Sequence, residues 1–288
     1  MTDIVLRKEL KMVLIKKKVG TLSKKVISPS PEIVLTLPKT VSVPITELGG
    51  YSTLIYGEKK IGKTTLASEF PSAFFMMLEP GAKALEVYQR PVQSWQEFKE
   101  YVKLLQKDSF FKTIVVDPVD IAYKFCSSYV CKKKVIEHPS DEEWGKGWEA
   151  VRDEFTTEIN KLLGMKKGVI LISHATEKEI KTRSGIKYHK IMATLTGQAQ
   201  EVLVSIVDIW AYYCYEGKTR MLVVEGDDHI GAGHRLLKHF KYTDGTPIAE
   251  IPMGKSSKEG YLNLIKAFNN QLQKGGTAAK KIVVVRKS

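Results

Sequence analysis

A run of glycine, lysine and threonine near residue 60 carries the clearest chemical signal in this sequence. Segment 57–64 reads GEKKIGKT and satisfies the pattern G-x-x-x-x-G-K-[ST], with an apolar run before it and a helix-like run after it. Glycines at both ends of the pattern let successive N–H groups point at phosphate oxygens, and the helix start adds its positive end. The alternative is a Gly-rich turn without a ligand. The predicted phosphate-binding residues are Gly57, Glu58, Lys59, Lys60, Ile61, Gly62, Lys63, Thr64 and Thr65.

Two side chains of this segment have predicted roles beyond binding. Lys63 is expected to reach the outer phosphates of a nucleoside triphosphate, and the Thr64 hydroxyl is expected to ligate Mg²⁺. A second metal ligand is predicted at Asp117, which ends the apolar run TIVVD at 113–117. Because ligands bind at the carboxyl ends of parallel strands, Asp117 should share one crevice with the loop after Tyr56. The alternative is an aspartate that only caps the strand end.

The general base is not indicated by the residue after Asp117. Many P-loop ATPases place a catalytic glutamate there, whereas this chain has Pro118. Glu79, at the carboxyl end of the second predicted strand (73–78), is our candidate for orienting and deprotonating the attacking water. Asp120 is the second candidate, and a surface ion pair is the alternative reading of Glu79.

A fourth strand, predicted at 169–172, ends on Ser173 and His174. His174 is a candidate catalytic residue that senses the γ-phosphate, or a partly buried histidine with satisfied hydrogen bonds. Residues 175–190 are expected to form a polar loop with net charge +3. Such a loop suits contacts with nucleic acid, although it also suits a solvated surface loop. The candidate nucleic-acid residues are Lys178, Lys181, Arg183, Lys187 and Lys190.

The net charge of +13 is concentrated at the two ends of the 288 residues. Residues 1–27 have net charge +6 and residues 274–288 have +5, which leaves +2 between them. Basic arms add sequence-independent affinity for nucleic acid, or they only solubilise the protein. Three cysteines and no long apolar run favour a protein of the cytoplasm, which is the host cytoplasm if the protein is viral, without a membrane partner.

Strand-like and helix-like patterns alternate along the chain. Strands are predicted at 53–56, 73–78, 111–116, 169–172, 202–213 and 220–224, and helices after the glycine-rich loop, after Ser94, after Trp148 and after Ser256. Residues 121–147 are expected to be irregular. This alternation predicts an α/β fold with a mostly parallel sheet and helices on both faces. The expected parts are a basic N-terminal extension at 1–50, a core at 51–250 and a C-terminal helix with basic tail at 251–288.

Together these segments resemble the phage-type RecA-like P-loop ATPases of single-strand annealing and recombination. The resemblance covers roughly 52–240 and depends on the glycine-rich loop, Leu78-Glu79-Pro80-Gly81, Val116-Asp117, Gly147-Trp148-Glu149, Ile172-Ser173-His174 and Val207-Asp208-Ile209. It implies a RecA-like core in which Glu79 is the base, His174 the sensor and the following loop the DNA contact. It also implies homo-oligomers with ATP between subunits, where Arg235 serves the γ-phosphate of a neighbour in trans.

The function expected from the sequence is a DNA-dependent ATPase that acts on single-stranded DNA with ATP and Mg²⁺. The absence of an N-K-x-D motif favours ATP over GTP. Two alternatives remain. One is a nucleotide-gated DNA-binding or loader module with little hydrolysis, and the other is a P-loop kinase with a defined acceptor pocket. Stimulation of turnover by DNA separates the ATPase from both.

Overall fold

The computed structural model describes residues 37–183 and 185–274. The basic extension up to residue 36 and the basic tail from residue 275, both predicted to contact nucleic acid, lie outside the described residues. The described residues from Pro44 onward belong to one compact unit. Within it the C-terminal helix contacts the helix that follows the glycine-rich loop. The predicted boundaries at 50 and 250 stay predictions.

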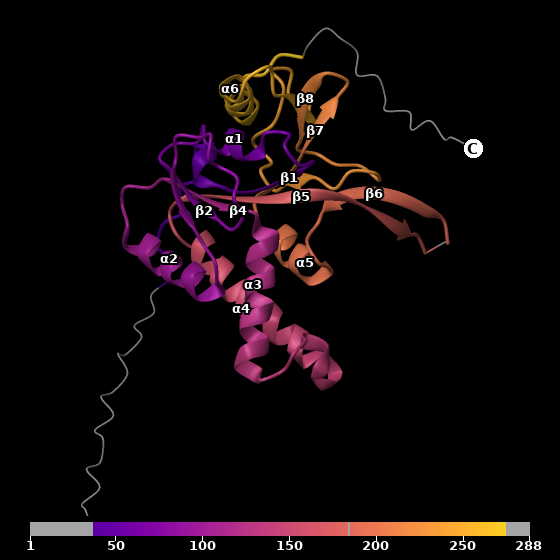
Figure 1. Ribbon diagram of the computed structural model, residues 1–288. Helices are drawn as coiled ribbons and strands as arrows, with labels where there is room; N and C mark the ends of the chain where they lie inside the picture. The colour runs from indigo at the N-terminus through magenta and orange to yellow at the C-terminus, as the bar shows by residue number, and fades with distance from the viewer. Residues whose placement is uncertain (1–36, 184, 275–288) are drawn as a thin grey trace, which may run out of the picture. The chain divides into compact units, whose positions relative to one another are not determined.

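A central sheet organises this unit (Figure 1). Six neighbouring strands run parallel, and one side of the sheet is extended by antiparallel strands. In spatial order the strands are β10 (Glu250–Pro252), β8 (Thr219–Val223), β7 (Ile209–Glu216), β1 (Ser52–Gly57), β5 (Gly168–Lys181), β4 (Thr113–Asp117), β2 (Ala73–Met77) and β3 (Tyr88–Pro91). Two further strands, β6 (Lys187–Ala193) and β9 (Gly233–His234), pair with β5 and β7.

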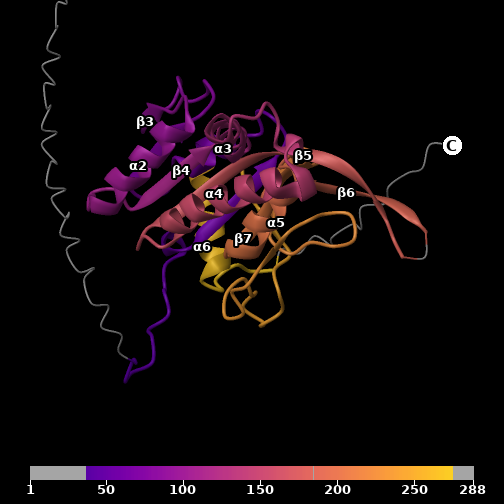
Figure 2. The ribbon, with the colours of Figure 1, turned by 90° about the horizontal axis from the view of Figure 1, so that it is seen from below.

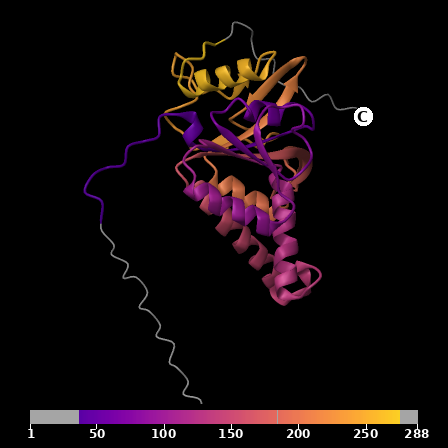
Figure 3. The ribbon, with the colours of Figure 1, turned by 60° about the vertical axis from the view of Figure 1, so that its left-hand side comes forward.

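Helices cover both faces of the sheet, as Figure 3 shows. One face carries α1 (Lys63–Ala67) and α6 (Ser257–Phe268). The other face carries α2 (Trp95–Lys107), α3 (Val119–Lys134), α4 (Lys146–Leu163) and α5 (Gly197–Ile206). Short 3₁₀ turns occur at Leu48–Gly50, whose Leu48 packs on the α1/α6 side, and at Pro139–Asp141 and Glu143–Gly145. The predicted fold class, an α/β protein with a mostly parallel sheet and helices on both faces, is therefore confirmed.

Strand β1 shows why its apolar run folds as an interior strand. Successive side chains of a strand point to opposite faces, so Leu54 and Tyr56 pack under the larger helix layer while Ile55 packs under α1 and α6. All three side chains are fully buried. Burial of one leucine-sized side chain contributes about 1.5–3 kcal/mol to stability. The strand therefore packs against both helix layers, and its carboxyl end is held at the centre of the sheet.

Three predicted elements were wrong. Residues 121–134, expected to be irregular, are most of α3, because Ala122, Tyr123, Cys126 and Val130 form a buried helical stripe among exposed lysines. The predicted strand at 202–213 begins as the end of α5, since a short apolar run does not distinguish a strand from a buried helix.

The third difference concerns the basic segment at 175–190. It is a β-hairpin, not a loop: the second half of β5 pairs antiparallel with β6. Its side chains alternate between half-buried and exposed, as in a two-stranded ribbon with one solvated face. The hairpin extends beyond the helices in Figures 1 and 2.

Candidate functional site

The glycine-rich loop leaves the carboxyl end of β1 and enters α1, as its sequence predicts. Gly62 adopts a left-handed conformation with φ of 107°, which a side chain would strain. Gly57 packs so closely against the Tyr213 carbonyl of β7 that a β-carbon would clash with it. Ile61 is buried in the core beneath α1, which holds the loop on the sheet. Helix α1 is only five residues long.

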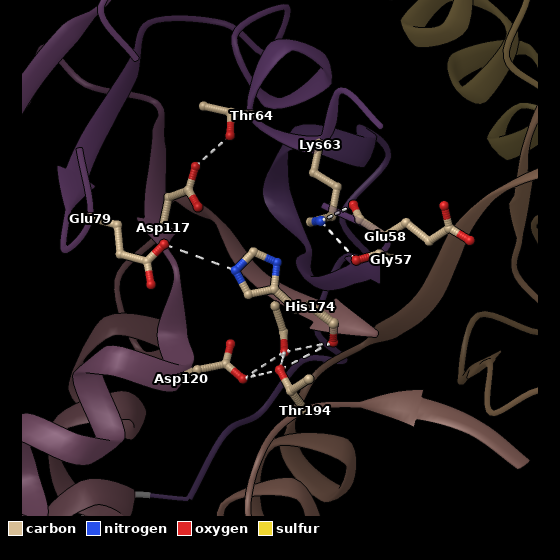
Figure 4. Close-up of polar contacts among 10 residues, drawn as sticks. Gly57, Glu58, Lys63, Thr64, Glu79, Asp117, Asp120, His174 and Thr194 are labelled. Atoms are coloured by element: carbon tan, nitrogen blue, oxygen red, sulfur yellow. Dashed lines mark hydrogen bonds and ion pairs between the residues drawn. The ribbon is translucent and has the colours of Figure 1, made fainter. Parts of the chain in front are cut away.

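Lys63 is a buried cation that folds back over this loop. Its Nζ donates hydrogen bonds of 2.8 Å to the Gly57 carbonyl and 2.7 Å to the Glu58 carbonyl (Figure 4). Burial lowers the pKa of Lys63 to about 8, although Asp117, Asp120 and Glu58 act in the opposite direction. The lysine charge is thus poorly compensated, which favours an added anion at this place.

Thr64 and Asp117 meet at the same end of the sheet. The Thr64 hydroxyl donates a 2.6 Å hydrogen bond to Oδ2 of Asp117. Burial raises the pKa of the Asp117 carboxyl, while the Thr64 hydrogen bond and the Lys63 charge lower it. A cation beside this carboxylate would stabilise its charged form and offset the effect of burial on its pKa.

These two oxygen groups fit the requirements of Mg²⁺. The ion prefers hard oxygen ligands and is usually held by one or two protein groups, with water and substrate phosphates completing the shell. No group of three or more His, Cys, Asp or Glu side chains suited to a metal occurs in the described part of the chain. Thr64 and Asp117 therefore match a Mg²⁺ ion that is bound together with a nucleotide.

Glu79 and His174 lie on the other side of this crevice. His174 Nε2 is 4.0 Å from Glu79 Oε2, and the histidine ring lies between Glu79 and Lys63 in Figure 4. The Nδ1 atom of His174 is buried and has no hydrogen-bond partner among the described residues. The structure thus brings Lys63, Thr64, Glu79, Asp117 and His174 to one place.

Asp120, the second candidate base, is engaged by hydroxyl groups. Its Oδ1 accepts hydrogen bonds from Ser173 and from Thr194, which follows β6. Both hydroxyls also approach the His174 carbonyl, at 3.3 Å. The aspartate therefore ties α3 to the base of the hairpin. Its other oxygen, Oδ2, is buried without a partner in the described structure.

The five candidate nucleic-acid residues fall into two groups on the hairpin. Lys178 donates to the Gln200 side chain at 2.8 Å, Lys190 donates to the Asp227 carbonyl at 2.9 Å, and Lys187 pairs with Glu179 at 2.9 Å. Lys181 and Arg183, nearest the turn, have no ion-pair partner among the described carboxylates. The cations near the turn are therefore the ones available to an outside phosphate.

Arg235 lies away from the other candidates. Its guanidinium donates a 2.7 Å hydrogen bond to the Ser205 carbonyl and is 3.9 Å from Asp208. Asp208 bonds the amino end of β1 through Ser52, at the edge of the sheet opposite the glycine-rich loop. Within one chain Arg235 does not reach the crevice, and its role toward a neighbouring subunit stays a prediction.

One residue near the site was missed from the sequence. Arg220 of β8 donates a 3.1 Å hydrogen bond from Nε to the Ile61 carbonyl in the glycine-rich loop. Its guanidinium also lies 5.5 Å from the centre of the Tyr215 ring. No local pattern marks Arg220, because its partner is distant in the sequence and is a backbone atom.

Comparisons with known proteins agree with this geometry. A family model described as an AAA domain, AAA_24, matches residues 49–238. The SPbeta prophage-derived uncharacterized protein YorG of Bacillus subtilis (strain 168) is 35% identical over 144 residues, which cover 48% of this chain and 45% of that protein. This chain therefore spans less than half the length of the curated relative that it matches.

Among solved structures, a KaiC-like protein of Pyrococcus horikoshii OT3 is similar over 73% of this chain and 88% of its own. That similarity has a TM-score of 0.41 and 14% sequence identity. In the described part of this chain, no helix is both long and apolar enough to cross a bilayer.

Proposed function

This chain belongs to the AAA_24 family of AAA domains, and we propose that it is a DNA-dependent ATPase that acts on single-stranded DNA in phage-type recombination or single-strand annealing. Family membership implies nucleotide binding, which agrees with the loop at 57–65. The DNA substrate, the homo-oligomeric state and a cytoplasmic location are parts of the proposal.

The crevice suggests how the residues divide the work on ATP. The backbone N–H groups of the loop hold the phosphates, and Lys63 exchanges its two carbonyl partners for phosphate oxygens. Thr64 and Asp117 would hold Mg²⁺, which supplies charge neutralisation on the phosphates when bound. Glu79 orients the attacking water and takes its proton.

The observation that carries the DNA part of this proposal is the continuity of β5. The strand runs without interruption from Gly168 in the core, through His174 in the crevice, to Lys181 in the basic hairpin. A displacement of His174 by the γ-phosphate is thus passed directly to the strand that carries the hairpin cations. Lys181 ends this strand and Arg183 follows it in the turn, and neither has an ion-pair partner among the described carboxylates.

ATP hydrolysis by the purified protein, with and without single-stranded DNA at one fixed low salt concentration, tests the proposal. We expect DNA to stimulate turnover, and Lys63→Ala to abolish it in both conditions. An equal rate of ATP hydrolysis with and without DNA would refute DNA dependence and favour a kinase or another partner-driven ATPase. Retained turnover in Lys63→Ala would show that the glycine-rich loop is not the site.

A further inference from the structure

A cleft opens between the start of α3 and the residues that follow β6, and it is continuous with the place of Glu79 and His174. Its volume is about 290 Å³, and we call it the side cleft. Glu79 and His174 line the side cleft and also the phosphate crevice, and Lys59 of the glycine-rich loop lies at its edge. A ligand in the side cleft would therefore be a neighbour of the outer phosphates of ATP.

One buried polar atom of the side cleft lacks a partner. Asp120 lines the cleft, and its Oδ2 atom is buried without a hydrogen bond in the described structure; the unpartnered Nδ1 of His174 faces the side of Lys63 in Figure 4. In Figure 4 the partnered oxygen of Asp120 faces Thr194, whereas the other oxygen points to the side of Glu79 and His174. Buried polar groups are normally hydrogen-bonded, so this atom indicates a ligand that supplies a hydrogen bond.

Thr196 adds a further polar group at the cleft wall. It is the N-cap residue of α5, yet its side chain makes no capping hydrogen bond. An adjoining hollow is lined by Tyr123, Trp148 and Gln198, and the buried Oε1 atom of Gln198 also lacks a partner among the described residues. The hollow and the side cleft share the lining residues Tyr123 and Thr196.

The remaining walls combine apolar side chains with two exposed lysines. Ile121, Tyr123 and Leu195 provide apolar lining, of which Tyr123 and Leu195 expose 4% and 2% of their surface. Lys59 and Lys124 line it as exposed cations, and no described carboxylate lies within ion-pair distance of either. Apolar walls with hydrogen-bonding groups suit a planar polar ring, while a pair of free lysines suits a phosphate.

We propose that the side cleft binds one nucleotide unit, a base with its phosphate, in addition to the ATP at the glycine-rich loop. The base lies against Tyr123 and Leu195 and bonds to Thr196 and Asp120, and the phosphate lies between the two lysines. The cleft volume of about 290 Å³ lies at the lower end of the range of about 300–1,000 Å³ that is usual for ligand sites. The cleft therefore suits a small ligand such as one nucleotide unit. This inference depends on nucleotide binding at 57–65 but not on DNA dependence.

The unit has two sources, a free nucleoside monophosphate or one residue of a single strand. Calorimetry in the presence of a non-hydrolysable ATP analogue separates them. The probes are the deoxynucleoside monophosphates and an oligothymidylate of about 16 nucleotides, the upper end of the usual single-strand site size. Tighter binding of the monophosphate identifies a free acceptor, and tighter binding of the oligothymidylate, with displacement of thymidylate, identifies a strand residue.

Lys124→Glu and Thr196→Val test the location. Each removes one proposed contact, and we expect each to weaken binding of the tighter probe by about tenfold or more. Lys132→Glu is the matched control, because this lysine is exposed on the same helix but does not line the cleft. It should retain the affinity of the unmodified protein, and binding of the ATP analogue should be unchanged in all three variants.

Two results would overturn the proposal: no binding of any probe at millimolar concentration, or binding that both cleft variants retain. The same probes and variants separate this inference from the proposed function. DNA-stimulated hydrolysis together with no binding of any probe would refute the side cleft and leave the ATPase. If both cleft variants weaken binding of a monophosphate but DNA does not stimulate hydrolysis, the side cleft is supported and the proposed DNA dependence is refuted.

Discussion

His174 Nε2 and Glu79 Oε2 lie 4.0 Å apart although His174 lies within β5 and Glu79 follows β2, two strands that are not neighbours. Strand β4, which ends at Asp117, lies between β2 and β5 in the sheet. A group that moves Glu79 therefore also acts on His174. Through β5, His174 is continuous with the basic hairpin.

Glu79→Gln should preserve ATP binding and stop turnover. The amide keeps the size of the side chain but does not accept the proton of the attacking water, and loss of a general base typically costs 10²- to 10⁴-fold in rate. Single-turnover hydrolysis and a separate measurement of ATP affinity check both parts. Glu86→Gln, an exposed change on the same connection, is the control. Unchanged turnover in Glu79→Gln would show that the general base is Asp120 or another residue.

ATP affinity should fall as the pH rises above about 8. The free Lys63 ammonium has a pKa of about 8, and phosphate oxygens stabilise its charged form, so ATP binding raises that pKa and takes up a proton. Between the two pKa values the dissociation constant should increase by up to about tenfold for each pH unit. Calorimetry in buffers of different ionisation enthalpy measures the uptake directly.

The matched variant for this pH effect is Lys63→Arg. Its guanidinium stays charged, so the dissociation constant of that variant, whatever its absolute value, should not depend on pH in this range. A dissociation constant of the unmodified protein that is flat from pH 7.5 to about 9.5 would contradict the lowered pKa.

Neutralising the hairpin cations should weaken binding of single-stranded DNA. In a variant with Lys181, Arg183 and Lys187 changed to glutamine, we expect the slope of log affinity against log salt to flatten by about 1.4, since about 0.7 counterion is released for each phosphate contact and Lys187 already pairs with Glu179. Titrations at several salt concentrations measure this slope. The control changes Lys132 and Lys133, exposed on α3, to glutamine. Equal slopes in both variants would make the hairpin a solvated surface.

Arg220→Met should weaken ATP binding without unfolding the protein. The change keeps an apolar stem on β8 but removes the hydrogen bond to the Ile61 carbonyl, so the glycine-rich loop loses one anchor. A hydrogen bond from a charged group contributes about 1.5–3 kcal/mol, which corresponds to roughly 10- to 150-fold in affinity if it acts only on the loop. Thermal unfolding separates the two effects. A lowered unfolding temperature with unchanged affinity would assign Arg220 to stability alone.

The local features of the fold were evident in the sequence. The loop at 57–65, the strand ending at Asp117 and the alternation of strands with helices are contiguous patterns, and their chemistry depends on neighbouring residues. The α/β class follows from them because apolar strands that are buried on both faces require helices on both sides.

Only the tertiary structure decided the rest. The hairpin depends on pairing of β5 with β6 and is not visible in a short window, whereas the apolar stripe of α3 at Ala122, Cys126 and Val130 is a local signal that was missed in the sequence. The bond from Arg220 to the Ile61 carbonyl and the contacts of Asp120 with Ser173 and Thr194 join distant segments. Hydrogen bonds of this kind leave no spacing in the sequence, because the distance along the chain between their partners is set by the fold and not by a local repeat.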